Sequence, residues 1–337
     1  MDSSLLLVMV VVAAIAFDLM NGFHDGCNAV STVIYTKALK PRTAIAVSAF
    51  FNFIGPFLGI KVAQTIGGVI SFSDADGDTM ALLVVSALLG AFIWDTLTWI
   101  WGLPVSSSHA LIGGLLGAGM IALGAEGVNW GKAATVMSAL VFSPLIGMSV
   151  GFILMYLSRR IIGAIRIDIE RADGFYRKMQ IFSSAFVSFT HGSNDATKVM
   201  GIITLFLAAH YQWEELHVPV WVILLCAGAM AVGTYLSVLS FRLIRTMGEG
   251  ITQLHPVHGF SAESGAALVI FTASRLGLPV STTHVVTSSV TGTGLASGLK
   301  SVGWKTFRDI LLAWVVTLPF CAGAAAASYF VLSKLMG

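Results

Sequence analysis

The chain alternates long apolar runs with short polar segments. An α-helix needs roughly 20 predominantly apolar residues to cross about 30 Å of hydrocarbon. Runs of this kind recur along the whole chain, at residues 5–34, 43–70, 79–101, 104–124, 131–158, 179–209, 217–244, 256–274, 279–299 and 306–333. We therefore expect an all-α polytopic membrane protein with about 10 to 12 membrane segments, including broken helices or re-entrant hairpins.

Composition supports a membrane location. Hydrophobic residues make up 56% of the 337 residues and charged residues only 11%, and the mean hydropathy is +0.86, a profile that soluble domains of this length do not show. The first apolar run has no basic residues before it and opens beside Asp2, so we interpret it as a retained membrane helix and not as a secretory signal. Cys27, Cys226 and Cys321 are scattered through apolar runs, which favours packing roles over disulfides.

Charge is distributed unevenly between the loops. The acidic segment contains Asp74, Asp76 and Asp78, whereas the central segment is rich in Arg159, Arg160, Arg166, Arg171, Arg177 and Lys178. Basic loops of membrane proteins stay in the cytoplasm. We expect a cell membrane (inner or plasma membrane) protein with five crossings before the central segment, a cytoplasmic central segment, and both termini and the acidic segment outside.

The chain repeats itself. The phrase "GLPVSSSH", from Gly102 to His109, returns 175 residues later as "GLPVSTTH", and "NGFHDGCNAVS" aligns with "HGSNDATKVMG" at an offset of 170, which superposes Asp25 on Asp195. Two similar halves with an odd number of crossings each must lie upside down relative to each other. We predict a first inverted repeat over 1–158, a cytoplasmic basic linker over 159–178 and a second inverted repeat over 179–337.

Inverted repeats are typical of secondary transporters, which hold their substrate near the middle of the bilayer with interrupted helices. In "GFHDGCN" and "HGSND", glycines and polar residues interrupt apolar runs. We predict a break in the helix at each phrase, because free backbone groups in a membrane must line a cavity.

The hydroxyl clusters predict an anion site. Gly-Leu-Pro should end one helix, and Pro followed by Ser or Thr should begin the next. The start of a helix offers free N–H groups and the positive end of its dipole to an anion. Capping of buried helices alone would also explain each cluster, but duplication at a fixed offset favours binding of a tetrahedral oxyanion by Ser106, Ser107, Ser108, Ser281, Thr282 and Thr283.

Acids inside a membrane are functional candidates because each costs roughly 2.5 to 3.5 kcal/mol to insert. Asp25 and Asp195 are repeat partners, and beside an anion they need a cation between them, so we predict that they bind a coupling ion or a metal, with Asn28 and Asn194 as neutral ligands. We interpret Asp18 and Asp95 as structural residues with interhelical hydrogen bonds. Lys198 either neutralises Asp195 or extends away from it. The sequence also leaves open the roles of His24, His109, His284 and Glu263.

Four segments, "NGFHDGCNAVSTVIYTKAL", "GLPVSSSHALIGG", "FTHGSNDATKVMGI" and "GLPVSTTHVVTSSVTGTG", together resemble the signatures of the inorganic phosphate transporter family. The resemblance covers nearly the whole chain and implies cation-driven uptake of free phosphate or of a neutral metal-phosphate complex. It places the family's functional residues on the carboxylates, amides and hydroxyls named above. Phe23-His24-Asp25 resembles the proton-coupled bacterial branch, while Cys27, Thr197 and Lys198 depart from the commonest pattern, so H+ and Na+ both remain open as coupling ions.

Two other functions compete with phosphate transport. Sulfate is another tetrahedral oxyanion, but it carries no proton at neutral pH to donate to a carboxylate. A hydrolase using Ser108 and His109 is disfavoured, because neighbouring residues on a helix point about 100° apart and no GxSxG elbow is present. We expect no enzyme activity, no cofactor and no nucleic-acid partner; the expected partners are inorganic phosphate and membrane lipid, with a homodimer left open.

Overall fold

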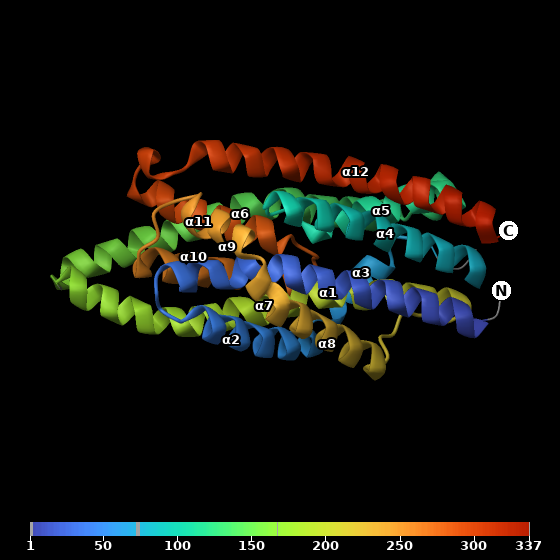
Figure 1. The fold of residues 1–337 in the computed structure, drawn as a ribbon, viewed down its shortest axis with the longest axis horizontal. Coiled ribbons are helices and arrows are strands. Elements are labelled where there is room, and N and C mark those ends of the chain that lie inside the picture. Colours follow the sequence, from blue (N-terminus) through green and yellow to red (C-terminus); the bar gives the residue numbers. More distant parts are fainter. Residues whose placement is uncertain (1–2, 72–74, 167, 337) are drawn as a thin grey trace.

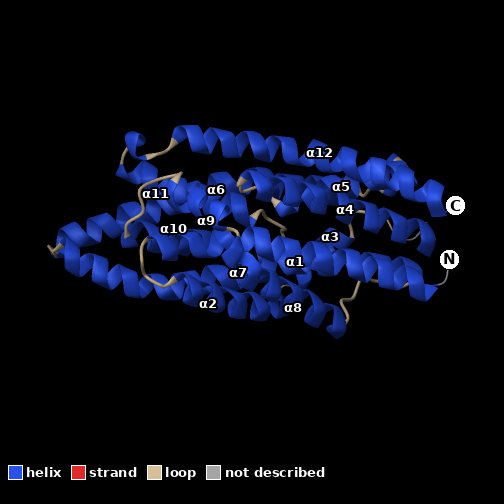
Figure 2. Cartoon of the chain, in the orientation of Figure 1, coloured by secondary structure: helices blue, strands red, loops and turns tan. Residues whose placement is uncertain are grey.

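The computed structural model describes residues 3–71, 75–166 and 168–336, and these fold almost entirely into helices (Figures 1 and 2). Asp74 lies outside the described residues. The α-helices are α1 (Ser3–Tyr35), α2 (Pro41–Ile54), α3 (Ile60–Gly67), α4 (Gly77–Trp101), α5 (Ser107–Leu123), α6 (Trp130–Ile165), α7 (Ile169–His210), α8 (Val220–Leu236), α9 (Phe241–Glu249), α10 (Pro256–Arg275), α11 (Thr282–Ser297) and α12 (Trp304–Met336).

Fewer helices can cross a membrane alone than the apolar runs predict. Within the described residues, five are long and apolar enough: α1, α4, α6, α12, and α8 with the turn that follows it. The broken pair formed by α2 and α3, bent by 69°, would make a sixth. The helix α5 is apolar but shorter, with 17 residues. The expected all-helical membrane fold is therefore confirmed, with five or six candidate spans.

Two helical hairpins account for part of this difference. The segments flanking the α4–α5 pair meet at an antiparallel bridge between Ile70 and Val128, and those flanking the α10–α11 pair meet between Thr252 and Val302. Each pair therefore starts and ends at one end of the molecule. Figure 1 shows that the open ends of the two hairpins lie at opposite ends of the long axis.

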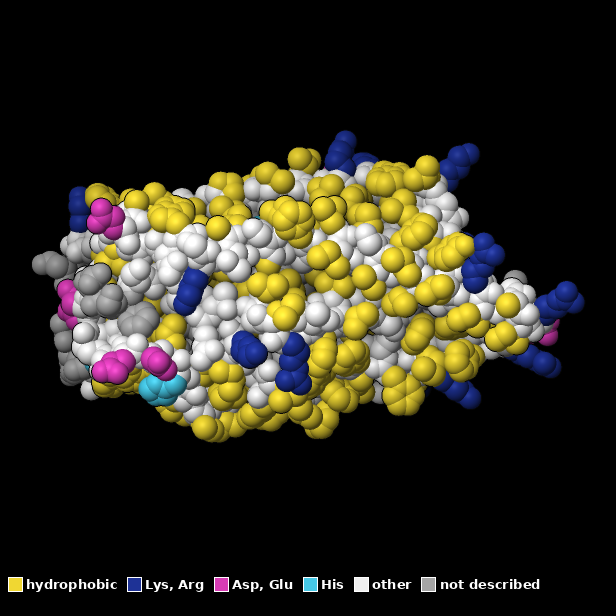
Figure 3. Space-filling model, turned by 180° about the vertical axis from the view of Figure 1, so that it is seen from behind, with side chains coloured by type: hydrophobic (Ala, Val, Ile, Leu, Met, Phe, Trp, Pro, Cys, Tyr) yellow, Lys and Arg dark blue, Asp and Glu magenta, His cyan; other side chains and the backbone are white. Residues whose placement is uncertain are grey.

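Most of the predicted linker 159–178 that the structure describes is helical. The helix α6 continues to Ile165, and α7 starts at Ile169. Charged residues on exposed helix faces need no loop. This junction projects at one end, and both termini lie at the other (Figure 1). Lys and Arg side chains project from the junction end, and apolar side chains make up much of the surface of the middle, with a few Lys or Arg side chains among them (Figure 3).

The helix breaks predicted at the two glycine-rich phrases are wrong. The helices α1 and α7 run without interruption through residues 21–28 and 191–198. The glycines instead allow neighbouring helices to approach closely: a Cβ on Gly22 would collide with the main-chain oxygen of Met230 in α8, and one on Gly192 with that of Asn52 in α2. Small residues at helix crossings are typical of membrane proteins.

Helices from the first half of the chain pack against helices from the second half. The helix α1 packs along α8, and α7 packs along α2; likewise α5 packs along α12, and α11 along α6. The largest hydrophobic cluster draws residues from both parts, including Phe17, Leu111 and Phe206. Val105 of the first hairpin tip belongs to this cluster, whereas Val280 of the second tip belongs to a separate cluster together with Ala29 of α1.

Candidate functional site

Each hairpin turns through a left-handed glycine. Gly102 has φ +70° and Gly277 has φ +74°, and in both tips the next residue returns a hydrogen bond to the helix, from Leu103 N to Thr98 O (3.0 Å) and from Leu278 N to Ala273 O (2.9 Å). Glycine adopts this conformation at no steric cost. The predicted stop at Gly-Leu-Pro is therefore confirmed in both halves.

The first hydroxyl of each cluster caps the returning helix. Ser106 Oγ accepts a hydrogen bond from His109 N (3.1 Å), and Ser281 Oγ accepts one from His284 N (3.2 Å). The predicted capping role is confirmed, although Pro104 lies in the tip before the cap and not in the first helical turn. Capping orients the two following hydroxyls of each cluster into the protein interior.

The Asp25 carboxylate of α1 lies against the first hairpin. Its Oδ2 accepts a hydrogen bond from Ser107 Oγ (2.9 Å). Its Oδ1 lies 2.8 Å from His24 Nδ1 and 3.3 Å from Asn28 Nδ2. All four residues are buried, so each of these contacts is shielded from water and is worth more than at a surface.

The Asp195 carboxylate of α7 lies against the second hairpin in the same manner. Its Oδ2 accepts a hydrogen bond from Thr282 Oγ1 (2.7 Å) and lies 3.2 Å from His191 Nε2. Its Oδ1 forms an ion pair with Lys198 Nζ (2.5 Å). Lys198 therefore neutralises Asp195 and does not extend away, which answers the question that its sequence position left open.

The last hydroxyl of each cluster contacts a side chain from the other half of the chain. Asn28 Nδ2 donates to Thr283 Oγ1 (2.9 Å), while Lys198 Nζ contacts Ser108 Oγ (2.5 Å). Lys198 Nζ and Ser108 Oγ also donate to the Val280 carbonyl oxygen in the second tip, over 2.9 and 3.1 Å. The two tips, α1 and α7 thus converge on one buried polar cluster.

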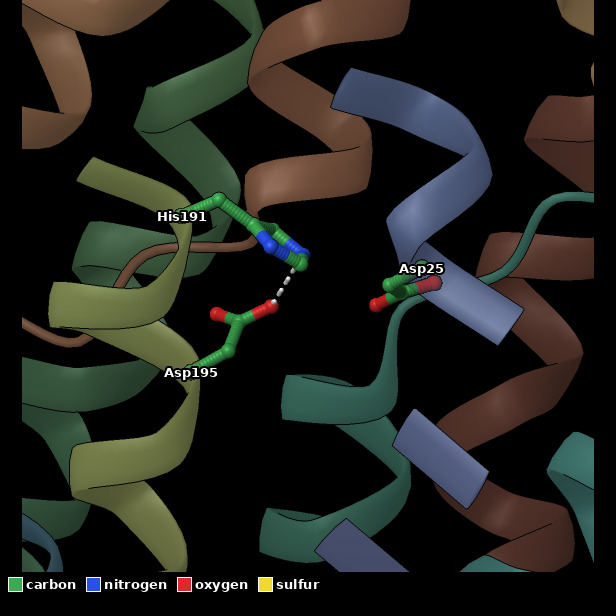
Figure 4. Close-up of side chains that lie close together, drawn as sticks. All are labelled: Asp25, His191 and Asp195. Carbon is green, nitrogen blue, oxygen red and sulfur yellow. Dashed lines mark ion pairs between the residues drawn. The ribbon is translucent and has the colours of Figure 1, made fainter. Parts of the chain in front are cut away.

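Three side chains of this cluster form a candidate metal or cation site. Asp25, His191 and Asp195 each offer a ligand atom within 4.8 Å of the others, and Figure 4 shows the two carboxylates facing each other from α1 and α7 with the imidazole between them. Sequence reasoning missed His191. Its spacing of four residues from Asp195 on one helix face was the available signal, and His191 Nδ1 lies 3.0 Å from Asn52 Oδ1.

Asn194 lies away from the carboxylate that it precedes. Its Nδ2 donates to Ser274 Oγ of α10 over 3.0 Å. Its Oδ1 is buried without a hydrogen-bond partner in the described part of the chain. The predicted pairing of Asn194 with Asp195 in one ligand set is not present in this conformation.

The duplicated histidines face each other behind the tips. The His109 and His284 rings lie 4.5 Å apart between centroids, and His284 stacks on Trp314 at 3.6 Å. Trp314 Nε1 in turn donates to the Pro104 carbonyl oxygen (3.2 Å). These contacts join the two hairpins to α12, so the histidines support the tips.

The remaining buried acids differ from one another. Glu263 accepts hydrogen bonds from Thr32 Oγ1 (2.5 Å), Gln180 Nε2 (2.9 Å) and Ser183 Oγ (2.5 Å), which tie α10 to α1 and α7. The carboxylate oxygens of Asp18 and Asp95 have no hydrogen-bond partner among the described residues. Asp18 nevertheless interacts with the Cys226 thiol of α8, which agrees with the structural role expected of it, whereas the interhelical hydrogen bond expected for Asp95 is not formed among the described residues.

Known proteins are similar to this chain in sequence and in fold. The Phosphate transporter family matches residues 21–325. A probable low-affinity inorganic phosphate transporter of Bacillus subtilis is 40% identical over 99% of this chain and its own full length, and one of Rhizobium meliloti is 40% identical over 98% of each chain. A solved sodium-dependent phosphate transporter superposes with a TM-score of 0.88 at 26% identity, over 98% of this chain and all of its own.

These relatives are transporters and not enzymes. The apolar helices agree with a multi-pass membrane protein. With its family match, its close relatives and its fold in agreement, the chain belongs to the Phosphate transporter family.

Proposed function

We propose that the protein is a symporter that takes up inorganic phosphate, free or bound to a divalent metal, together with H+ or Na+. Residues 1–158 and 179–337 form two inverted repeats joined by the basic linker 159–178, and they alternate the site between the two sides of the cell membrane. The paired helix contacts, the mirrored hairpins and the family match support this proposal.

One observation carries the proposal: in each hairpin tip, the middle hydroxyl of the cluster donates its only hydrogen to a buried carboxylate. Ser107 donates to Asp25, and Thr282 to Asp195. A hydroxyl offers a single O–H donor, so neither can donate to phosphate while it serves the carboxylate. A cation bound to the carboxylates would free both hydroxyls for the anion.

This exchange of partners couples the two substrates. Without a mobile cation, the Asp25 carboxylate, which no ammonium neutralises, would repel an incoming oxyanion. With a cation at Asp25 and Asp195, supported by His191 and Asn28, the carboxylate charge is compensated. The freed Ser107 and Thr282 can then turn towards phosphate, joined by Ser106, Ser108, Ser281 and Thr283 around the two helix N-termini. Asn194 would join the cation ligands only after leaving Ser274.

Phosphate fits this cluster better than sulfate. At neutral pH phosphate keeps at least one proton and can donate a hydrogen bond to a carboxylate or hydroxyl oxygen, whereas sulfate only accepts. The cluster offers such acceptors in Asp25, Asp195 and the Val280 carbonyl. Similarity to a solved sodium-dependent phosphate transporter supports both the anion and a cation requirement.

Alternating access follows from the mirrored hairpins. The first tip contacts α1 and the second contacts α7, and each of these helices also packs against helices of the other half of the chain. Rocking one half against the other would therefore open the polar cluster to one end of the molecule at a time. The basic end of the molecule faces the cytoplasm in this proposal, because positively charged segments remain on that side.

Labelled phosphate uptake into proteoliposomes tests the proposal. Sodium and pH gradients are imposed separately, with magnesium added or withheld, and unlabelled sulfate is added in excess. We expect gradient-driven phosphate accumulation that excess sulfate does not suppress. Absence of accumulation under every gradient would overturn the proposal, and equal suppression by sulfate would make the protein a general oxyanion permease.

A further inference from the structure

Lys198 holds an arrangement of oxygen atoms that is suited to a free cation. Its ammonium contacts a carboxylate (Asp195 Oδ1, 2.5 Å), a hydroxyl (Ser108 Oγ, 2.5 Å) and a main-chain carbonyl at a hairpin tip (Val280 O, 2.9 Å). Oxygen ligands of these kinds bind hard cations, and irregular main-chain segments supply such carbonyls in transporters. The side chain is only 2% exposed, so its charge depends on these three groups.

The mirrored position in the first half carries no such charge. Asn28 aligns with Lys198 in the repeat and makes the matching contacts, to Asp25 Oδ1 (3.3 Å) and Thr283 Oγ1 (2.9 Å). An amide donates hydrogen bonds but does not neutralise a carboxylate. The two halves therefore hold their aspartates in similar geometry but compensate their charge differently.

We propose that Lys198 is a covalently attached substitute for one coupling cation. The ammonium stays with Asp195, because both residues lie on α7, three positions apart. The mobile cation that binds between Asp25 and Asp195 then has to compensate only the charge of Asp25. The protein would consume one coupling cation fewer per phosphate than a transporter with a neutral residue at both positions. This inference rests on the proposed function.

The reciprocal variants Lys198→Asn and Asn28→Lys test this role. In Lys198→Asn, sodium would have to supply the missing charge at Asp195, so the order of the sodium dependence of phosphate uptake should rise by about one relative to the unaltered protein. In Asn28→Lys a second tethered ammonium should remove about one unit from the order of cation dependence. Exposed Lys300→Asn is the matched control and should leave both the order and the rate unchanged.

A second measurement does not require transport. Sodium should raise the midpoint of thermal unfolding of Lys198→Asn more than that of the unaltered protein, because a ligand that binds only the folded state stabilises it. A purely structural ion pair would give a destabilised variant whose midpoint responds to sodium as the unaltered protein does.

The outcomes separate this inference from the proposed function. If the unaltered protein accumulates no phosphate, the proposed function fails first. If it does accumulate phosphate, but Lys198→Asn is inactive at every sodium concentration or keeps the original order of cation dependence, the tethered-cation role is wrong. If Lys198→Asn does not fold, Asn28→Lys decides, and an unchanged cation dependence there overturns the inference.

Discussion

Ser107 donates its hydroxyl hydrogen to Asp25 Oδ2 over 2.9 Å, although the two residues are 82 positions apart in the chain. Thr282 makes the mirrored bond to Asp195 Oδ2. Both bonds join a hairpin tip to a long helix inside the protein. A change in the charge state of either carboxylate must therefore be felt at a tip, which gives cation binding a direct mechanical link to the anion site.

The paired hydroxyls should control phosphate affinity. Removing both in Ser107→Ala together with Thr282→Ala eliminates two donors, each worth about 1.5–3 kcal/mol when the acceptor is charged. Phosphate affinity should fall by roughly 100-fold or more, since the two donors together contribute about 3–6 kcal/mol and about 1.4 kcal/mol corresponds to tenfold. Phosphate dependence of uptake in proteoliposomes measures the loss.

A matched control for this variant is Ser288→Ala. Ser288 lies on α11 and is buried, and its hydroxyl has no hydrogen-bond partner in the described residues. It should retain the original phosphate affinity. Unchanged affinity in the double variant would move the anion site away from the tips.

Asp25 should be required for coupling. Asp25→Asn keeps the size of the side chain and an oxygen for Ser107 but removes the negative charge, so a cation loses its main ligand on α1. Gradient-driven uptake should fall by at least about tenfold, equivalent to about 1.4 kcal/mol of lost cation binding, while the protein still inserts and remains monodisperse.

Asp18→Asn provides the comparison, because Asp18 is a buried aspartate on the same helix without a hydrogen-bond partner among the described residues. Its uptake should stay close to that of the unaltered protein. Normal gradient-driven uptake by Asp25→Asn would show that the coupling cation binds elsewhere.

The hairpin tips were readable from sequence because local chemistry determines them. In both tips the helix ends at a glycine with positive φ and the next helix is capped by a serine, as predicted, although the proline lies before the cap. Duplication of the phrase then marked the tips as more than ordinary turns. Their meeting with Asp25 and Asp195 was predicted on the same grounds.

Contacts between residues far apart in the chain could not be predicted from the sequence. The glycines at 22 and 192 were interpreted as breaks in helices, yet they allow α1 and α7 to contact the main chains of α8 and α2. No local signal distinguishes these two uses of glycine. The contacts of Lys198 depend in the same way on the Val280 carbonyl, 82 residues away, and no local pattern indicates that acceptor.

Close helix contact at Gly192 should make it intolerant of a larger residue. A Cβ there would collide with the main chain of Asn52, which cannot move aside as a flexible side chain could. Overpacking of this kind costs about 1–3 kcal/mol, so Gly192→Ala should lower the midpoint of thermal unfolding in detergent.

Gly163→Ala supplies the control, because no atom lies within 4 Å of a Cβ at that position of α6. Alanine is favoured over glycine within a helix by about 0.5–1 kcal/mol, so this variant should be neutral or slightly more stable. Equal midpoints for the two variants would mean that α2 and α7 are not in close contact in the folded protein.

The membrane orientation can be tested with single cysteines at opposite ends. Arg171 lies in the basic segment and Glu214 lies between α7 and α8, and both are exposed. Arg171 lies in the first turn of α7, and Glu214 lies shortly after its last residue, so the two positions mark opposite ends of this helix. We expect these two ends to face opposite sides of the membrane. The native cysteines are buried, so they should react slowly with a maleimide that does not cross membranes.

In intact spheroplasts, Glu214→Cys should be labelled and Arg171→Cys should be protected until the membrane is permeabilised. The physical reason is the retention of basic segments in the cytoplasm, which leaves the opposite end of α7 outside. Labelling of both after detergent lysis shows that each thiol is reactive. The reverse pattern in intact spheroplasts would invert the proposed topology and place the hairpin α10–α11 at the outer side of the membrane.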